Sequence, residues 1–427
     1  MVPSYCERIG LPPTAHEFVA GLREKLERTA QRVDDGYPEN NGELMIRDQG
    51  EPTLKRVIKR DIPQSALELQ AAVLQKMPTR SLLDILCDVE HWTDFTRHFG
   101  SLSGSDPKLE RAVERYLLTI FVLGTNLGVN QGARHMRGTV TAHMLSFVNR
   151  RHVTAAADGT QYHLYEQNLV ADYHIRYGSF GAIAYHHVSD NYIALFSHFI
   201  PPGVWEAIYI IEGLLKNTSV IQPDRVHADT QGQSTPVFAF SHLLGIQLMP
   251  RIRNWKDLTF YRSDKSSSYQ HIDSLFSDTV DWKLIEDLWP DLMQVAISIE
   301  KGRVSSSVLL RKLGNYSRKN RLYQVAREVG RVIRTIFLLD YISDLPLRRQ
   351  ITATTNKAEA YNGFAKWLFF GGEGVITEND RDEQEKRIKY NDLVANAAIR
   401  KMLLISGVSW RNWTGKAGRF PKSILLT

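Results

Sequence analysis

The sequence has little cysteine. Only Cys6 and Cys87 occur among 427 residues, and they lie far apart without the close spacing of metal ligands. Structural disulfides belong to oxidising compartments, and zinc sites need clustered ligands. We therefore expect neither disulfides nor zinc fingers, and a reducing cytoplasm is the default location.

Long apolar runs are also missing. The most apolar stretch covers about 14 residues from Tyr116 to Val129, and it is interrupted by polar residues such as Asn126. A membrane-spanning helix needs about 20 apolar residues. The N-terminus has polar residues and prolines where a secretory signal would have an apolar segment. We expect a soluble protein without a membrane partner.

Acidic residues are absent from positions 399–427, which contain six basic residues. The remaining chain has 47 basic and 47 acidic residues, so the net charge of +6 comes from this tail. Overall charge is thus no argument for nucleic-acid binding, and local clusters must supply it. One cluster lies at 301–349, with 12 basic and three acidic residues.

The periodicity of apolar residues changes near position 150. Before it, spacings of three and four predict helices at 16–33, 64–77, 80–99, 108–124 and 130–149. After it, the pattern predicts strands at 152–158, 180–188 and 191–200, a helix at 204–217, a strand at 224–229, a helix at 234–244 and a strand at 246–250.

This order of elements is that of the α/β ribonuclease-H-like fold, a mixed sheet flanked by helices. There the first and fourth strands run parallel and adjacent. We expect Asp158 and Asp229, each at the C-terminal end of one of these strands, to lie close together.

The remaining chain exceeds what this core needs. We interpret 253–350 as a mostly helical insertion with helices at 281–300 and 321–340. A last core helix is expected at 354–370, capped by Thr354 or Thr355, followed by a charged solvent-facing segment at 373–389. The predicted division is a helical N-terminal region at 1–150, the core at 151–252, the insertion at 253–350, the last core helix and charged segment at 351–398, and a basic tail at 399–427.

Three carboxylates suggest metal chemistry. Asp158, Asp229 and Glu359 would hold two Mg²⁺ ions, because this hard cation prefers oxygen ligands and two such ions can promote in-line phosphoryl transfer. Each residue also has a structural interpretation, as a turn former, a cap, or an acid in the first turn of a helix. The competitors Asp172, Asp190 and Asp224 are expected in loops or turns. His186, His187 and His227 are expected to be buried or sheet-face residues.

Basic residues near the insertion are candidates for DNA contact, although a charge run is more often a solvated surface. The candidates are Arg318, Lys319, Arg321, Arg348, Arg349 and Lys357.

Four long motifs resemble the catalytic region of the Tn-three family of replicative DDE transposases. They are DGTQYHLYEQN, YGSFGAIAYHHVSDNY, HADTQGQSTPVFAFSHLLGIQLMPRIRNWKDLTFYR and NKAEAYNGFAKWLFFGGEG. The resemblance implies that Asp158, Asp229 and Glu359 are the family's three acids. It also implies Mg²⁺-dependent nicking at transposon ends, with Mn²⁺ as a substitute, and transfer of the 3′-OH into target DNA. A bacterial cytoplasmic protein that acts as a homodimer on DNA, associated with the nucleoid, is implied too.

Two departures from the family pattern lead to further expectations. The family's N-terminal half, which binds the terminal inverted repeats, has no counterpart here, so a truncated copy is expected. The pattern stops after about residue 398, and a frameshifted tail would explain the basic segment that follows. The alternatives are a catalytically silent remnant that binds DNA or a full-length transposase, and a general ribonuclease-H-like nuclease.

Overall fold

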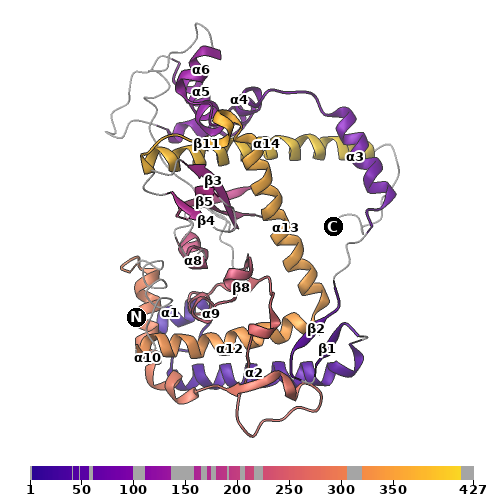
Figure 1. Cartoon of the computed structure of the whole chain (residues 1–427), viewed down its shortest axis with the longest axis vertical. Helices are drawn as coiled ribbons and strands as arrows, with labels where there is room; N and C mark the ends of the chain where they lie inside the picture. The colour runs from indigo at the N-terminus through magenta and orange to yellow at the C-terminus, as the bar shows by residue number, and fades with distance from the viewer. Residues whose placement is uncertain are drawn as a thin grey trace. The chain divides into compact units, whose positions relative to one another are not determined.

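The computed structural model describes residues 2–40, 42–47, 49–56, 61–99, 111–135, 158–164, 171–174, 179–189, 192–201, 207–215, 225–304 and 320–414 (Figure 1). It is a mixed α/β protein with two compact units. The first unit comprises Met1–Val57, Thr154–Gly159 and Val204–Glu359, and the second comprises Ile58–Val153, Thr160–Gly203 and Ala360–Thr427.

The first unit is built around a long helix, α12, which packs against α2, α9 and α10. Its helices are α1 (Val2–Ile9), α2 (Ala15–Gly36), α8 (Ala207–Leu215), α9 (Thr235–Leu243), α10 (Trp282–Glu300), α12 (Arg321–Ser343) and the larger part of α13 (Leu345–Leu368). Its strands are β1 (Leu44–Ile46), β2 (Pro52–Leu54), β7 (Arg225–Ala228), β8 (Gln247–Pro250), β9 (Phe260–Arg262) and β10 (Phe276–Thr279). These strands form three two-stranded sheets, β1–β2, β7–β8 and β9–β10.

The predicted helices of this unit form because local caps and apolar spacing agree. The carboxylate of Asp281 accepts the amide of Leu284 at 3.0 Å at the start of α10, and the side chain of Asn320 accepts that of Leu322 at 2.9 Å at the start of α12. The predictions for 16–33, 281–300 and 321–340 are confirmed as α2, α10 and α12.

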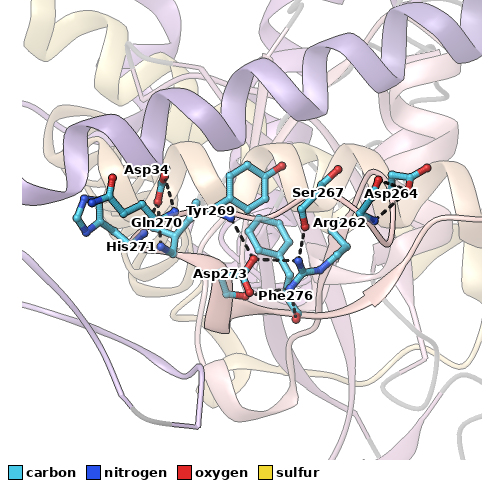
Figure 2. A network of polar contacts seen from close by, with 11 residues as sticks. Asp34, Arg262, Asp264, Ser267, Tyr269, Gln270, His271, Asp273 and Phe276 are labelled. Carbon is cyan, nitrogen blue, oxygen red and sulfur yellow. Dashed lines mark hydrogen bonds and ion pairs between the residues drawn. The ribbon is translucent and has the colours of Figure 1, made fainter.

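The connection between β9 and β10 is fixed to α2 by a buried carboxylate (Figure 2). Asp34 on α2 accepts the backbone amides of Gln270, His271 and Ile272 at 2.9, 2.6 and 3.0 Å. On the same connection, Arg262 donates to Asp273 at 2.9 Å. These bonds give an irregular segment the partners that a buried backbone requires.

The second unit contains a five-stranded mixed sheet of order β11–β3–β5–β4, with β6 paired to β5. Its strands are β3 (Asp158–Leu164), whose first two residues belong to the first unit, β4 (Asp172–His174), β5 (Ser179–Val188), β6 (Ala194–Ile200) and β11 (Val375–Ile376). Strand β11 is parallel to β3, while β4 and β6 are antiparallel to β5. The helices are α3 (Gln64–Lys76), α4 (Leu82–Thr93), α5 (Ala112–Gly124), α6 (Val129–His135) and α14 (Arg381–Thr414).

The charged segment at 373–389 is only partly solvent-facing, contrary to the prediction, because five of its 17 residues are buried. Within α14, Gln384, Lys386 and Arg387 are at most 6% exposed. Arg387 donates to Asn126 at 2.6 Å and pairs with Glu378, while Lys386 pairs with Glu383 at 3.2 Å. Burial is tolerated because each charge has a partner. Helix α14 also continues past residue 398.

The start predicted for the last core helix is wrong. Helix α13 begins at Leu345, and the carboxylate of Asp344 accepts the amide of Leu347 at 3.0 Å. Thr354 and Thr355 therefore lie inside the helix, where their hydroxyls donate to carbonyls one turn earlier, at 3.0 and 2.9 Å.

The expected adjacency of the Asp158 and Asp229 strands is not among the described pairings. Strand β7 pairs in parallel with β8, and β3 belongs to the five-stranded sheet. The described fold is therefore mixed α/β, and the ribonuclease-H-like arrangement remains an inference.

Candidate catalytic site

Asp229 directly follows a buried strand. Val226 and Ala228 on β7 are 6% and 1% exposed, and β7 runs parallel to β8 with Ala228 opposite Pro250. The half-buried Asp229 begins a tight turn, since its carbonyl accepts the amide of Gly232 at 3.1 Å. The prediction of a strand, an acid and then a helix is confirmed here, because α9 follows this turn.

Arg251 lies at the same edge, because it follows β8 as Asp229 follows β7. Its backbone amide donates to the carbonyl of Ala228 at 2.8 Å. Its guanidinium Nη1 lies 3.8 Å from Oε1 of Glu359 on α13. Arg251 therefore connects the end of this parallel pair to the second candidate acid. The Glu359 side chain is 58% exposed, so it remains accessible to a ligand.

The turn after Asp229 is held from two sides. The side-chain amide of Gln233 donates to the carbonyl of Arg251 at 3.4 Å, and Arg334 on α12 donates to the carbonyl of Gln233 at 3.2 Å. Burial lowers the pKa of Arg334. A Cβ on Gly232 would lie 3.0 Å from the Cβ of Ala228, so little space is left beside the strand. The surroundings of Asp229 are thus fixed by packing as well as by hydrogen bonds.

Asp158 is the first residue of β3, not the last residue of a strand as predicted. Strand β3 extends from Asp158 to Leu164. Its residues Gln161, Tyr162 and Leu164 are buried, at 2%, 1% and 5% exposed. Residues 152–157 and the side chain of Asp158 lie outside what the structure describes. Asp158 is nevertheless assigned to the same compact unit as Asp229 and Glu359.

The donor chemistry suits a hard divalent cation, since Asp229 and Glu359 offer carboxylate oxygens. Within the described residues, however, no group of three or more His, Cys, Asp or Glu side chains is arranged to hold a metal. Asp229 and Glu359 thus both lie near Arg251, while the side chain of Asp158 lies outside the described residues.

The histidines were interpreted as buried residues, and His186 and His187 confirm this at 0% and 1% exposed. The Nε2 atom of His186 lies 3.0 Å from Oδ1 of Asp392, which also accepts the hydroxyl of Tyr361 at 2.9 Å. His227 on β7 is half-buried.

The predicted DNA-contact residues divide into three groups. Arg321 and Arg349 are exposed and Lys357 is half-buried. Arg348 contradicts the prediction, because it is 3% exposed and its Nη2 lies 3.5 Å from Oε2 of Glu43. Arg318 and Lys319 lie outside the described residues.

Sequence reasoning missed Arg251. The available signal was its position, since it follows a predicted strand as Asp229 does, and parallel neighbours end at one edge of a sheet. A basic residue there was not singled out because its link to Glu359 spans distant segments of the chain.

Among the described helices, none combines the length and apolar character needed to cross a bilayer.

Comparisons with known proteins give a consistent picture. The family model "Tn3 transposase DDE domain" matches residues 84–156 and 152–405, which continues past residue 398. The transposase for transposon Tn1546 of Enterococcus faecium is 30% identical over 399 residues, covering 86% of this chain and 40% of that protein. The transposase for Tn21 of Escherichia coli is 32% identical, covering 79% and 37%. The transposase for gamma-delta of Escherichia coli (strain K12) is 27% identical, covering 96% and 44%. The chain thus spans about two fifths of these curated relatives.

Proposed function

The chain belongs to the Tn3 transposase DDE domain family, and from this membership we propose that Asp158, Asp229 and Glu359 are the catalytic acids of a replicative transposase. A transposase acts on DNA, and a DDE domain implies dependence on a divalent metal. The observation that supports the assignment lies at the shared edge of β7 and β8. There the backbone of Arg251 bonds to the end of β7 and to the turn after Asp229, and its guanidinium lies 3.8 Å from the carboxylate of Glu359.

The proposed reaction is nicking of the 3′ end at a transposon end, followed by transfer of the freed 3′-OH to target DNA. Two Mg²⁺ ions, for which Mn²⁺ substitutes, would activate the attacking hydroxyl and stabilise the leaving oxygen. The chain supplies the carboxylates that hold them, and no covalent enzyme nucleophile is needed.

Arg251 has a positioning role in this proposal. Its guanidinium lies 3.8 Å from Glu359, which is longer than a hydrogen bond, so it orients the carboxylate without occupying it. It also offsets repulsion among the three acids before a metal binds.

The proposal includes the architecture and partners expected of such an enzyme. It has a ribonuclease-H-like core at 151–252 and 351–398, a helical insertion at 253–350, a helical region at 1–150 and a basic tail at 399–427. Transposon inverted-repeat ends and target DNA are the partners, a homodimer is the acting form, and the nucleoid is the location. Exposed Arg321 and Arg349, with Lys357, are the proposed DNA contacts; Arg318 and Lys319 complete the set, and buried Arg348 is left out.

Metal dependence tests this proposal. The purified chain is incubated with labelled duplex DNA in which an inverted-repeat end joins flanking DNA. We expect a nick with a free 3′-OH in Mg²⁺ or Mn²⁺ and none with excess EDTA, because the carboxylates alone cannot stabilise the leaving oxygen. Denaturing electrophoresis measures the product.

The alternatives give different results in the same assay. A salt-sensitive DNA shift without metal-dependent product would indicate a silent DNA-binding remnant. Equal cleavage of unrelated DNA or RNA–DNA hybrids would indicate a general nuclease.

The positioning role of Arg251 predicts a graded response. Arg251→Gln should lower the nicking rate about tenfold to a hundredfold and raise the Mg²⁺ concentration needed for half-maximal rate, because Glu359 loses its orienting charge. Arg251→Lys should retain most of the activity. Arg253→Gln, at an exposed neighbouring arginine, is the matched control. An Arg251→Gln protein with the original metal dependence would contradict the role.

A further inference from the structure

Two aromatic side chains at the C-terminal end of α13, in the second unit, face solvent. Trp367 is 71% exposed, the most of any large apolar side chain in the described part of the chain, and Phe370 is 53% exposed. Leu368 and Phe369 between them are 0% and 2% exposed. Exposed apolar residues are ordinary when they are scattered singly, whereas an exposed apolar patch marks a contact surface.

These aromatic side chains are held in place by the structure beneath them. The ring of Phe364 stacks against Trp367, with centroids 5.9 Å apart and planes at 20°. After Phe370, the amide of Gly371 donates to the carbonyl of Thr125 at 2.8 Å, which fixes the backbone. The indole of Trp367 is therefore supported by one aromatic neighbour at the end of a fixed helix.

Gly363 supplies an independent observation. It lies one turn before Trp367, is exposed, and has nothing within 4 Å of the place where a Cβ would be. Glycine inside a helix is less stable than alanine, and here neither packing nor a positive φ requires it. Glycine is also used where a ligand approaches the backbone closely. The helix thus offers bare backbone beside an exposed indole.

The charge next to these residues favours a nucleotide over an apolar partner. Lys366 is exposed between Gly363 and Trp367 in the sequence. Burial, and after it the positive charge of Lys366, lowers the pKa of His163 on β3. Lys366 and Trp367 follow Gly363 by three and four residues, so both side chains flank it on one side of α13. A lysine and an indole placed in this way suit the phosphate and the base of a single-stranded nucleic acid.

We propose that Gly363, Lys366 and Trp367 form a binding site for an unpaired nucleotide of a DNA strand. The base stacks on Trp367, the phosphate contacts Lys366, and the sugar approaches α13 at Gly363. This inference rests on the proposed function in that DNA is the substrate, and it assigns a contact outside the three acids.

The test uses the whole chain and a single-stranded oligonucleotide of about 15 nucleotides that carries 2-aminopurine, a base whose fluorescence falls on stacking. The wild type should quench it. Trp367→Ala should lose the quenching and about tenfold in affinity, whereas Trp367→Phe should keep most of both.

Two further variants separate ligand contact from folding. Gly363→Ala should raise Tm by about one to three degrees and yet weaken binding, since its methyl group fills the approach to the backbone. Trp92→Ala is the matched control, because that indole is 45% exposed but one face of its ring is already covered by the Lys401 ammonium, 4.7 Å from the ring centroid, so no base can stack there. It should bind as the wild type does.

The inference is overturned if Trp367→Ala quenches and binds like the wild type, or if the wild type binds no single strand. It is also overturned if light scattering shows that Trp367→Ala loses only self-association, which would make the surface a protein contact. Transposon-end nicking is scored separately. Quenching that depends on Trp367, without nicking, would contradict the proposed catalysis but not this site. Nicking together with quenching that does not depend on Trp367 would contradict this site but not the proposed catalysis.

Discussion

Asp229→Asn should lower the rate of metal-dependent nicking by about a thousandfold or more. Asparagine keeps the shape of the side chain, so the turn that joins the carbonyl of residue 229 to Gly232 should persist. What it removes is the anionic oxygen that we propose as a ligand of the divalent cation, and a lost metal contact costs several kcal/mol of transition-state stabilisation. The measurement is the initial rate of nicking on the transposon-end duplex at saturating Mg²⁺.

The control for this variant is Asp287→Asn, at an exposed acid on α10. It changes the net charge equally and should leave the rate unchanged. Unfolding of both variants, followed by circular dichroism, shows whether the fold is retained. If Asp229→Asn nicks DNA at the wild-type rate, Asp229 is not a catalytic acid.

Gly330→Ala should lower the free energy of unfolding of the first unit by about 3–5 kcal/mol. Gly330 lies where α12 passes α9, and its Cβ would be 1.9 Å from the carbonyl oxygen and 2.5 Å from the carbonyl carbon of Thr235. Both atoms belong to backbone, so no side-chain rotation can relieve the overlap. The helices would have to separate, which would open the contact of Phe238 with Phe337, whose rings are 5.6 Å apart.

Urea unfolding followed by circular dichroism checks this expectation, with the transitions of the two compact units fitted separately. Gly21→Ala is a suitable control, since Gly21 is also helical, on α2, but has nothing within 4 Å of its Cβ position. That variant should gain about 0.5–1 kcal/mol from helix propensity. An unchanged urea midpoint for Gly330→Ala would show that α9 and α12 are not packed this closely.

The predictable parts of the fold are those whose signals are local. The sequence predicted helices at 281–300 and 321–340, and the structure confirms them as α10 and α12, with Asp281 and Asn320 as their caps. The short strand before Asp229 was recognisable because Val226 and Ala228 alternate with the polar Arg225 and His227, and a polar turn follows.

The parts that were predicted wrongly depend on contacts between distant segments. Arg348 looks like a surface cation in the sequence, yet it is buried beside Glu43. Arg387 lies in a charged run, yet it donates to Asn126 inside the second unit. Glu43 and Asn126 lie far from these arginines in the sequence, so hydropathy assigned both arginines to the surface.

The candidate site shows the same division. Asp229 and Glu359 were identifiable as acids in suitable elements, but their link through Arg251 depends on the pairing of β7 with β8. The residue type at 251 carries no signal until that register is known.

The attachment of Asp34 to three consecutive amides has a consequence for cooperativity. The connection between β9 and β10 cannot open alone, since opening would leave a carboxylate that is 3% exposed without its three donors. An unpaired buried carboxylate is costly. Local opening of this segment is therefore tied to fraying of the last turn of α2, and the two should behave as a single cooperative element.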